Sequence, residues 1–193
     1  MTILSMVLLC AVPVAGIAQP VYSLDVAGKL EFHAASVYSP LWTVEAAAYA
    51  GILQGFDSPR EWGQGAGAYG QRFASIAGAC GIHAVLAFGL DSTLHEDPRY
   101  FRSLSSGFWH RTAHALRGTI LTHTDRGGET LSAWRLGSAY GGAYLSDQWY
   151  PDRLNTVRRG AMGGTLRLGF DFASNIGFEF WPDVKRKILR RKP

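Results

Sequence analysis

The sequence is poor in charge and almost free of cysteine. Lysine, arginine, aspartate and glutamate make up 18% of its 193 residues, apolar residues make up 47%, and there are two cysteines. This composition excludes an intrinsically disordered chain, which has few apolar and many charged residues. The length is typical of one domain with a core of its own.

Outside its last nine residues, the sequence also lacks an excess of positive charge. The net charge is +4, but six of the 19 basic residues lie between 185 and 192, and the other 13 are outnumbered by 15 acidic residues. The near-neutral body excludes a basic nucleic-acid-binding protein. Aromatic residues directly before clustered cations are typical of a membrane interface. The expected contact with an anionic membrane surface or another envelope component uses one aromatic and six basic residues: Trp181, Lys185, Arg186, Lys187, Arg190, Arg191 and Lys192.

Residues 1–18 resemble a secretory signal peptide. Their apolar run has no charge, and Gly16 and Ala18 are small residues at the positions that signal peptidase reads. We expect export, with cleavage before Gln19; because no lysine or arginine precedes the apolar run, an uncleaved anchor is the alternative. Cleavage would leave Cys80 as the only cysteine, without an intrachain disulfide, and we interpret it as a small buried hydrophobe.

The longest regular segment lies between Trp62 and Arg102. Apolar side chains recur there at alternating spacings of four and three, which predicts one stripe of an α-helix. The stripe consists of Tyr69, Phe73, Ile76, Cys80, His83, Ala87, Leu90 and Leu94. Small residues beside it, among them Gly78, predict close packing against another helix. Asp97-Pro98 is expected to end the helix, because proline lacks an amide donor and restricts the residue before it.

Part of this helix is long enough to cross a membrane. Residues 73–90 are 18 positions without aspartate, glutamate, lysine or arginine, which meets the minimum length of a spanning helix. The many alanines and glycines make the stretch weakly hydrophobic, and His83 lies within it. A buried core helix is the favoured interpretation, and a membrane span is the alternative.

Further helices complete the predicted fold, a single all-α domain. They are expected over 41–54, 108–124, 131–150 and 156–190, the last with a break near Pro182. The prediction is therefore a glycine-rich bundle of about five helices over residues 41–184. A partly ordered segment over 19–40 precedes this bundle, and a basic tail over 185–193 follows it.

Two features of these helices leave alternatives. Residues 165–173 also alternate apolar residues with polar or small ones, which fits a strand, although we favour the helix. Three helices begin with glycines four apart, which indicates close helix packing, in this chain or in an oligomer. The pairs are Gly63/Gly67, Gly137/Gly141 and Gly160/Gly164.

The densest polar cluster follows the long helix. Within six positions, 95–100, it has a base, two acids, a cation and a phenol, which can serve as acid, base and anchor in a hydrolytic site. The same groups also cap helix ends and form local ion pairs. A second cluster, 146–153, has a similar pattern, and acids and an amide four apart on the last helix (Asp171, Asn175, Glu179) face either these clusters or solvent. The candidate catalytic residues are His95, Glu96, Asp97, Arg99, Tyr100, Asp152, Arg153 and Asp171.

No metal site or cofactor is expected. His110 and His114 are four apart on a predicted helix, but the metalloprotease pattern needs glutamate at the intervening position, where Arg111 stands. The spacing of the cluster at 95–100 matches no zinc motif. His83, on the apolar stripe, is interpreted as a core histidine with a hydrogen-bond partner.

Six short motifs occur in order between residues 40 and 190. They are Trp62-Gly-Gln-Gly65, Tyr69-Gly-Gln-Arg-Phe73, His95-Glu-Asp-Pro-Arg-Tyr100, Thr124-Asp-Arg-Gly-Gly128, Trp149-Tyr-Pro-Asp152 and Phe180-Trp-Pro-Asp-Val-Lys-Arg-Lys187. Together they resemble a family of uncharacterised exported bacterial proteins. The resemblance implies an envelope location and a helical, glycine-rich body, and it implies no activity.

We interpret the protein as an exported, envelope-associated helical protein with a structural or interaction role, in the periplasm or against a membrane. The alternative is an envelope hydrolase or transferase that acts on lipid or glycan through the cluster at 95–100. A third hypothesis is a small-ligand binder between the glycine-faced helices. Convergence of His95, Asp97, Asp152 and Asp171 on one cavity would favour the enzyme, and outward-pointing clusters the structural role.

Overall fold

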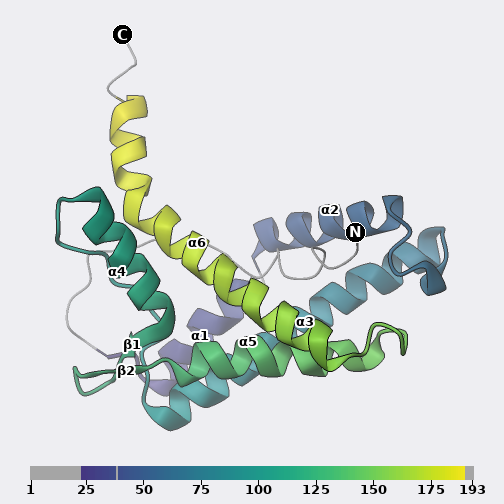
Figure 1. Ribbon diagram of the computed structural model, residues 1–193, viewed down its shortest axis with the longest axis horizontal. Coiled ribbons are helices and arrows are strands. Elements are labelled where there is room, and N and C mark those ends of the chain that lie inside the picture. Colours follow the sequence, from purple (N-terminus) through teal and green to yellow (C-terminus); the bar gives the residue numbers. More distant parts are fainter. Residues whose placement is uncertain (1–22, 38, 190–193) are drawn as a thin grey trace.

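The computed structural model describes residues 23–37 and 39–189 and is built almost entirely from helices (Figure 1). The described residues form six α-helices, so the all-α class is confirmed, with one helix more than expected. They are α1 (Val26–Val37), α2 (Pro40–Gly55), α3 (Ala66–Leu94), α4 (Phe108–Ile120), α5 (Ala133–Ser146) and α6 (Val157–Leu189). Two strands, β1 (Leu121–His123) and β2 (Glu129–Leu131), and two 3-10 turns, η1 (Arg60–Trp62) and η2 (Asp147–Trp149), connect them.

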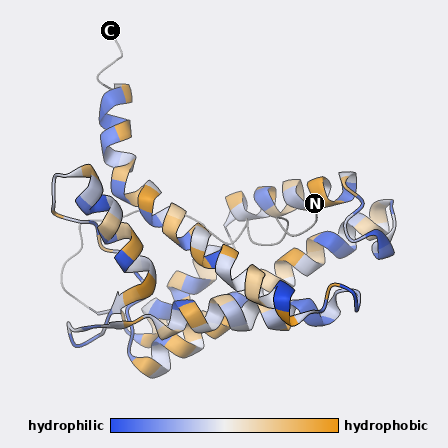
Figure 2. Ribbon diagram, viewed as in Figure 1, coloured by the Kyte–Doolittle hydropathy of each residue, from blue (hydrophilic) through white to orange (hydrophobic). Residues whose placement is uncertain are grey.

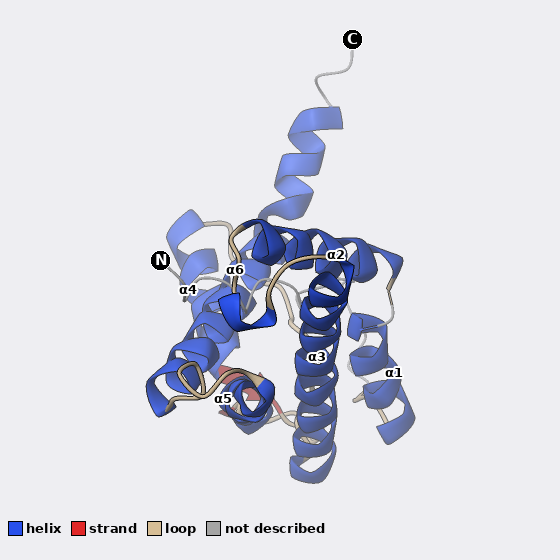
Figure 3. Ribbon diagram, turned by 90° about the vertical axis from the view of Figure 1, so that its right-hand side faces the viewer, coloured by secondary structure: helices blue, strands red, loops and turns tan. Residues whose placement is uncertain are grey.

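Helix α3 lies at the centre, with α1 and α5 on either side of it (Figure 3). Its first half packs against α2 around a cluster of buried side chains that includes Trp42, Tyr49, Leu53, Ile76 and Cys80. Burial of these apolar groups is the main favourable contribution to folding at this contact. The predicted stripe of α3 therefore faces the core, and Cys80 is buried as predicted.

Of the described helices, α3 is the one long and apolar enough to cross a membrane, judged by length and composition alone. The two charged residues that bound its uncharged part, Arg72 and Asp91, are fully buried. Arg72 donates hydrogen bonds to the backbone carbonyls of Ser58, Pro59 and Gly63, so it fixes the turn between α2 and α3. The exposed surface of this part of α3 therefore has no charge.

Close helix packing occurs at two of the three predicted glycine pairs. On α5, a Cβ added at Gly137 would lie 2.6 Å from a Leu90 methyl carbon of α3, and one at Gly141 3.2 Å from Leu86. On α6, Gly160 and Gly164 accept the rings of Tyr144 and Tyr140 of α5. These small residues let α3, α5 and α6 approach closely. A Cβ at Gly63 or Gly67 would meet no atom within 4 Å, and Gly78 contacts the ring of Trp149 in η2, not another α-helix.

Helix α6 is continuous from Val157 to Leu189, so the strand alternative over 165–173 is wrong. The predicted break at Pro182 is also wrong, because the helix runs through this residue. Its last turns extend away from α5 (Figure 1) and carry mostly hydrophilic residues (Figure 2). Residues 185–189 therefore belong to a helix, and the rest of the predicted tail lies outside the described residues.

Two elements differ from the sequence prediction for physical reasons. Residues 26–37 form helix α1, whereas only a partly ordered segment was expected; Lys29 and His33 are its buried residues, so no apolar stripe indicated a helix. The helix predicted over 108–124 ends at Ile120, because Leu121–His123 pair with β2 in an antiparallel hairpin. The next residue, Thr124, also forms a bridge with Glu96.

The predicted signal peptide and the cleavage before Gln19 lie outside the described residues. The prediction that Cys80 is the only cysteine of the mature chain depends on that cleavage, so it also stays a prediction. Arg190, Arg191 and Lys192 lie beyond the last described residue.

Candidate functional site

His95 ends α3 and points outward. It adopts a left-handed backbone conformation with φ of 57°, and its amide N–H donates to the carbonyl of Asp91. A left-handed residue is a common helix terminator, although glycine is usual there. The imidazole is 70% exposed and lies 3.6 Å from Asp125 Oδ2. The last helical residue, Leu94, lies three residues before Asp97 of the predicted Asp97-Pro98 stop.

Glu96 caps another helix. Its two carboxylate oxygens accept hydrogen bonds of 3.2 and 3.1 Å from the amides of Ala133 and Trp134, the first residues of α5. A negative side chain at this position satisfies free amides and complements the helix dipole. Burial raises the pKa of Glu96, and the two backbone hydrogen bonds act in the opposite direction. Glu96 is 3% exposed, and each of its carboxylate oxygens accepts from one of these amides.

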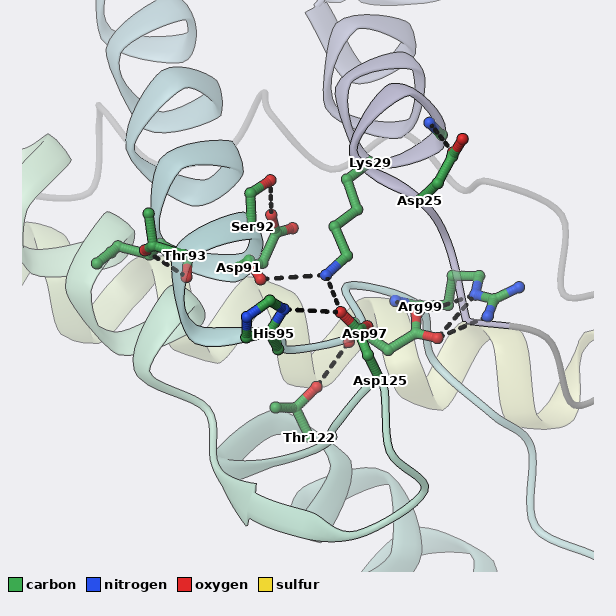
Figure 4. A network of polar contacts seen from close by, with 12 residues as sticks. Asp25, Lys29, Asp91, Ser92, Thr93, His95, Asp97, Arg99, Thr122 and Asp125 are labelled. Atoms are coloured by element: carbon green, nitrogen blue, oxygen red, sulfur yellow. Dashed lines mark hydrogen bonds and ion pairs between the residues drawn. The ribbon is translucent and has the colours of Figure 1, made fainter.

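Asp97 and Arg99 form a local ion pair beside the hairpin. Arg99 Nη2 lies 2.6 Å from Asp97 Oδ2, and the Arg99 amide also donates to this carboxylate. The backbone of Asp97 is held from the other side, because its amide donates to the carbonyl of His123 and its carbonyl accepts from the Thr122 hydroxyl. The ion pair and these two backbone hydrogen bonds together hold the chain between α3 and α4 against β1 (Figure 4).

A buried network joins α1 to this junction. Lys29, 2% exposed, donates to Asp125 Oδ2 at 2.8 Å and to the carbonyl of Asp91 (Figure 4). His33 lies 2.6 Å from the carboxylate of Asp91, which is fully buried. Buried charges need such partners, because removal from water is costly. No local sequence pattern predicts this network, because its members are separated by up to 96 positions.

Tyr100 connects the same junction to α6. Its phenol donates a hydrogen bond of 2.9 Å to Glu179 Oε2, and the amide of Ser103 donates to the same oxygen. Arg111 of α4 binds the other oxygen, Oε1, at 2.9 Å. Burial alone would raise the pKa of Glu179, but the hydrogen bonds from Arg111, Ser103 and Tyr100 together hold it below its usual value. This fully buried carboxylate is therefore ionised, and it ties α4 and the preceding loop to α6.

Three polar residues spaced four apart on α6, Asp171, Asn175 and Glu179, have different surroundings. Asn175 and Glu179 are buried, and Asn175 donates to Thr119 of α4, so these two face protein and not solvent. Asp171 instead pairs with Arg167 of its own helix at 3.3 Å. Of the two alternatives for these residues, contact with the first cluster is found for Glu179, through Tyr100.

The second cluster lies elsewhere. Arg153 pairs with Glu61 on the exposed surface, and Asp152 is exposed. Asp147, at the start of η2, is buried and pairs with Arg159 at 3.1 Å. Burial raises the pKa of Asp147 to about 6, against the lowering effect of Arg159.

The candidate catalytic residues therefore do not converge. Of the four that would have favoured an enzyme, His95 is exposed beside Asp125, Asp97 pairs with Arg99, Asp152 is at the surface and Asp171 pairs with Arg167. These contacts hold helix ends and loops in place. One cavity lies beside β1 and another between α4 and α6, and none of the four lines either of them.

His114, one of the two histidines considered as metal ligands, has a backbone partner, and the core histidine His83 has a side-chain partner. His114 Nε2 lies 2.9 Å from the carbonyl of Phe101, and His83 Nε2 lies 3.2 Å from the Ser138 hydroxyl, as expected of a core histidine. Burial lowers the pKa of His83 well below its usual value, which favours the neutral ring. Within residues 23–37 and 39–189, no group of three histidine, cysteine, aspartate or glutamate side chains is arranged to hold a metal ion.

The end of the molecule formed by α4 and the last turns of α6 combines exposed apolar and basic side chains. Phe108 and Phe180, whose ring centroids are 5.1 Å apart, join the two helices there. Each is followed by an exposed tryptophan, Trp109 at 77% and Trp181 at 61%. We call this the basic aromatic end and define it by Leu104, Phe108, Trp109, Trp181, Val184, Lys185, Arg186, Lys187 and Ile188, all of which are exposed.

Three of these residues are predicted membrane-surface cations. Arg186 pairs with Asp183, one turn earlier on α6. Lys185 and Lys187 have no carboxylate within ion-pair distance in the described part of the chain. Trp181 and the cations form a run that is visible in the sequence. Leu104 and Trp109 could not be predicted with them, because only the fold brings α4 and the loop before it beside α6.

Comparison with known proteins identifies no relative: no family model, no curated protein and no solved structure matches the chain. The resemblance to exported bacterial proteins therefore stays a prediction.

Proposed function

We propose that this protein is exported, associates with the cell envelope in a structural or interaction role, and binds an anionic membrane surface through its basic aromatic end. The observation that carries the proposal is that Trp109 and Trp181, both exposed, follow the two phenylalanines whose contact joins α4 to α6, and that Lys185, Arg186 and Lys187 follow Trp181 on α6. Tryptophan rings favour the headgroup level of a bilayer, and each nearby cation adds roughly 1 kcal/mol of attraction to an anionic surface.

The distribution of apolar side chains supports this proposal. Large hydrophobic residues are exposed on α2, α4 and α6, and Leu104, Trp109 and Val85 are more than two-thirds exposed. Charged residues such as Lys29, Arg72 and Glu179 are instead buried. Six of the exposed apolar residues, Leu104, Phe108, Trp109, Trp181, Val184 and Ile188, belong to the basic aromatic end, and an apolar patch beside cations is typical of a surface that contacts a membrane or a partner.

The enzyme alternative has less support. It depends on convergence of the candidate catalytic side chains, and their partners are separate. Glu96, Asp97, Arg99 and Tyr100 are engaged in capping and ion pairs that hold α5, β1 and α6.

Cell fractionation tests the location. After export, the protein is expected in the envelope fraction, to be released by high salt or alkali and not to need detergent, because it binds the surface without crossing the bilayer. N-terminal sequencing of the same material is expected to give Gln19 first. Recovery in the cytoplasm would contradict the proposal, and an intact Met1 in the membrane fraction would make residues 1–18 an anchor.

A further inference from the structure

An open cleft of about 490 Å³ lies within the basic aromatic end, between the first turn of α4 and the last turns of α6. Its lining includes two phenyl rings, one carboxylate and three cations, with Ser106 at the edge. These residues are Phe108, Phe180, Asp183, Arg111, Arg186 and Lys187. The volume is sufficient for a small polar ligand with the first part of an apolar chain.

One cation of the cleft is held in place by the protein. Arg111 binds one carboxylate oxygen of each of two acidic residues: its Nε lies 2.9 Å from Glu179 Oε1, and its Nη1 lies 2.5 Å from Asp183 Oδ2. Its guanidinium carbon also lies 4.3 Å above the ring of Phe180. Since these contacts fix the guanidinium, it contributes a rigid polar wall whose charge is balanced by its carboxylate partners.

The charge of the cleft is positive even after its internal pairs are counted. Arg111 and Arg186 both contact Asp183, and these hydrogen bonds keep the pKa of Asp183 below its usual value. Glu179 lies behind the wall and neutralises a second cation. Lys187 is then left with no internal carboxylate partner in the described part of the chain. Its ammonium group has three donors for an anion.

The two aromatic rings indicate that the ligand has an apolar part beside its anionic group. Phe108 and Phe180 form an apolar wall next to the cations, and each precedes a tryptophan that is exposed at the same end. A phosphate that bears an acyl-glycerol group matches both features, because its anion contacts cations while its chain contacts the rings. An inorganic phosphate would use only the first feature.

We propose that this cleft binds the phosphate of an anionic phospholipid, with Lys187 as the residue that contacts it and Arg111 as the fixed wall. The inference rests on the proposed membrane-surface function and adds a specific headgroup site to it. Lipid binding would then combine general attraction to an anionic surface with one defined contact.

The test compares Lys187→Gln with Lys185→Gln in the full-length mature chain. Both residues are exposed on the same turns of α6 and both substitutions remove one charge, but only Lys187 lines the cleft. The probe is dioctanoyl-phosphatidylglycerol below its critical micelle concentration, so that no membrane is present. Its affinity for the ¹⁵N-labelled protein is measured by NMR titration. We expect roughly tenfold weaker binding for Lys187→Gln, the size of one charge-assisted hydrogen bond, and little change for Lys185→Gln. Unchanged thermal melts would show that both variants fold.

The outcomes separate the site from the general function. Equal affinities of the two variants for the soluble lipid would overturn the headgroup site, as would binding of inorganic phosphate as tightly as the lipid. Anionic vesicles are titrated in parallel. If the wild type binds the soluble lipid in a Lys187-dependent way but does not bind vesicles, the site stands and the proposed membrane-surface function fails.

Discussion

The phenol of Tyr100 donates a hydrogen bond of 2.9 Å to the buried carboxylate of Glu179, 79 residues later in the chain. This contact joins the segment after α3 to α6, just before the residues of the basic aromatic end. Arg111 of α4 binds the same carboxylate. Glu179 therefore holds in place the two helices that present Trp109 and Trp181.

Removal of the Tyr100 hydroxyl is expected to destabilise the fold. Tyr100→Phe leaves one oxygen of a buried carboxylate with a donor fewer, and we expect a loss of about 1.5 kcal/mol in the free energy of unfolding, measured by urea denaturation. Tyr140→Phe is the control, because its hydroxyl contacts Thr165 at an exposed position. Equal stabilities of the two variants would show that the Tyr100–Glu179 contact contributes nothing.

Glu179 is expected to govern part of the stability at acid pH. Its pKa is lower in the folded chain than its ordinary value of 4.5, so its ionised form stabilises the fold above that value. This contribution is lost as the pH falls through the lowered pKa. In Glu179→Gln, which is less stable at pH 7, unfolding free energy should fall less steeply below pH 4.5 than in the wild type. Parallel pH profiles below this value would contradict the assignment.

Asp147 is expected to have the opposite effect in a higher pH window. Its folded pKa is about 6 and its ordinary value 3.8, so the folded chain binds more protons between these values. Wild-type stability should therefore decrease as the pH rises from about 4 to 6, by an amount on the order of 2 kcal/mol. Asp147→Asn removes this decrease, as thermal melts at pH 4, 5, 6 and 7 would reveal. A variant with the wild-type profile would mean that the buried carboxyl is ionised throughout.

Glycine substitutions test the packing of α5 against α6. A methyl group at Gly164 would overlap the ring of Tyr140, so Gly164→Ala is expected to destabilise by about 1–3 kcal/mol. Gly169→Ala is the control on the same helix, because a Cβ there meets no atom within 4 Å. The control is expected to stabilise slightly, since alanine favours helices by up to ~1 kcal/mol over glycine. Similar changes in both variants would mean that α5 and α6 are not closely packed.

The sequence predicts helices well where the apolar spacing is regular. The stripe of α3 and the glycine pairs of α5 and α6 are local patterns, and both correspond to buried contacts. Helix α1 was missed because its buried positions are Lys29 and His33, which are charged or polar. Strand β1 was missed because its conformation depends on pairing with β2 and with the segment at Glu96. The intrinsic helix or strand preference of its own residues does not depend on such partners.

The candidate site was predictable only where its residues are neighbours in sequence. Trp181 and the cations after it form a visible run, whereas Trp109 joins them through the contact of Phe108 with Phe180. The polar cluster at 95–100 suggested chemistry because its residues are adjacent. Their hydrogen-bond partners, such as Ala133 for Glu96 and Glu179 for Tyr100, are distant in sequence, so no local pattern could predict them.

The most direct test of the proposed function is vesicle binding by a tail variant, Lys185→Gln/Arg186→Gln/Lys187→Gln, which removes the three cations of the basic aromatic end. Its control, Arg60→Gln/Arg126→Gln/Arg158→Gln, removes the same charge from exposed arginines elsewhere on the surface. Co-sedimentation is measured with phosphatidylglycerol-containing and with neutral vesicles, at low and at high salt, because salt screens surface attraction. We predict that the wild type and the control bind the anionic vesicles at low salt, and that the tail variant binds them much more weakly while it melts at the wild-type temperature. Equal binding of the wild type and the tail variant to anionic and neutral vesicles would contradict the proposal that this end of the molecule binds an anionic membrane surface.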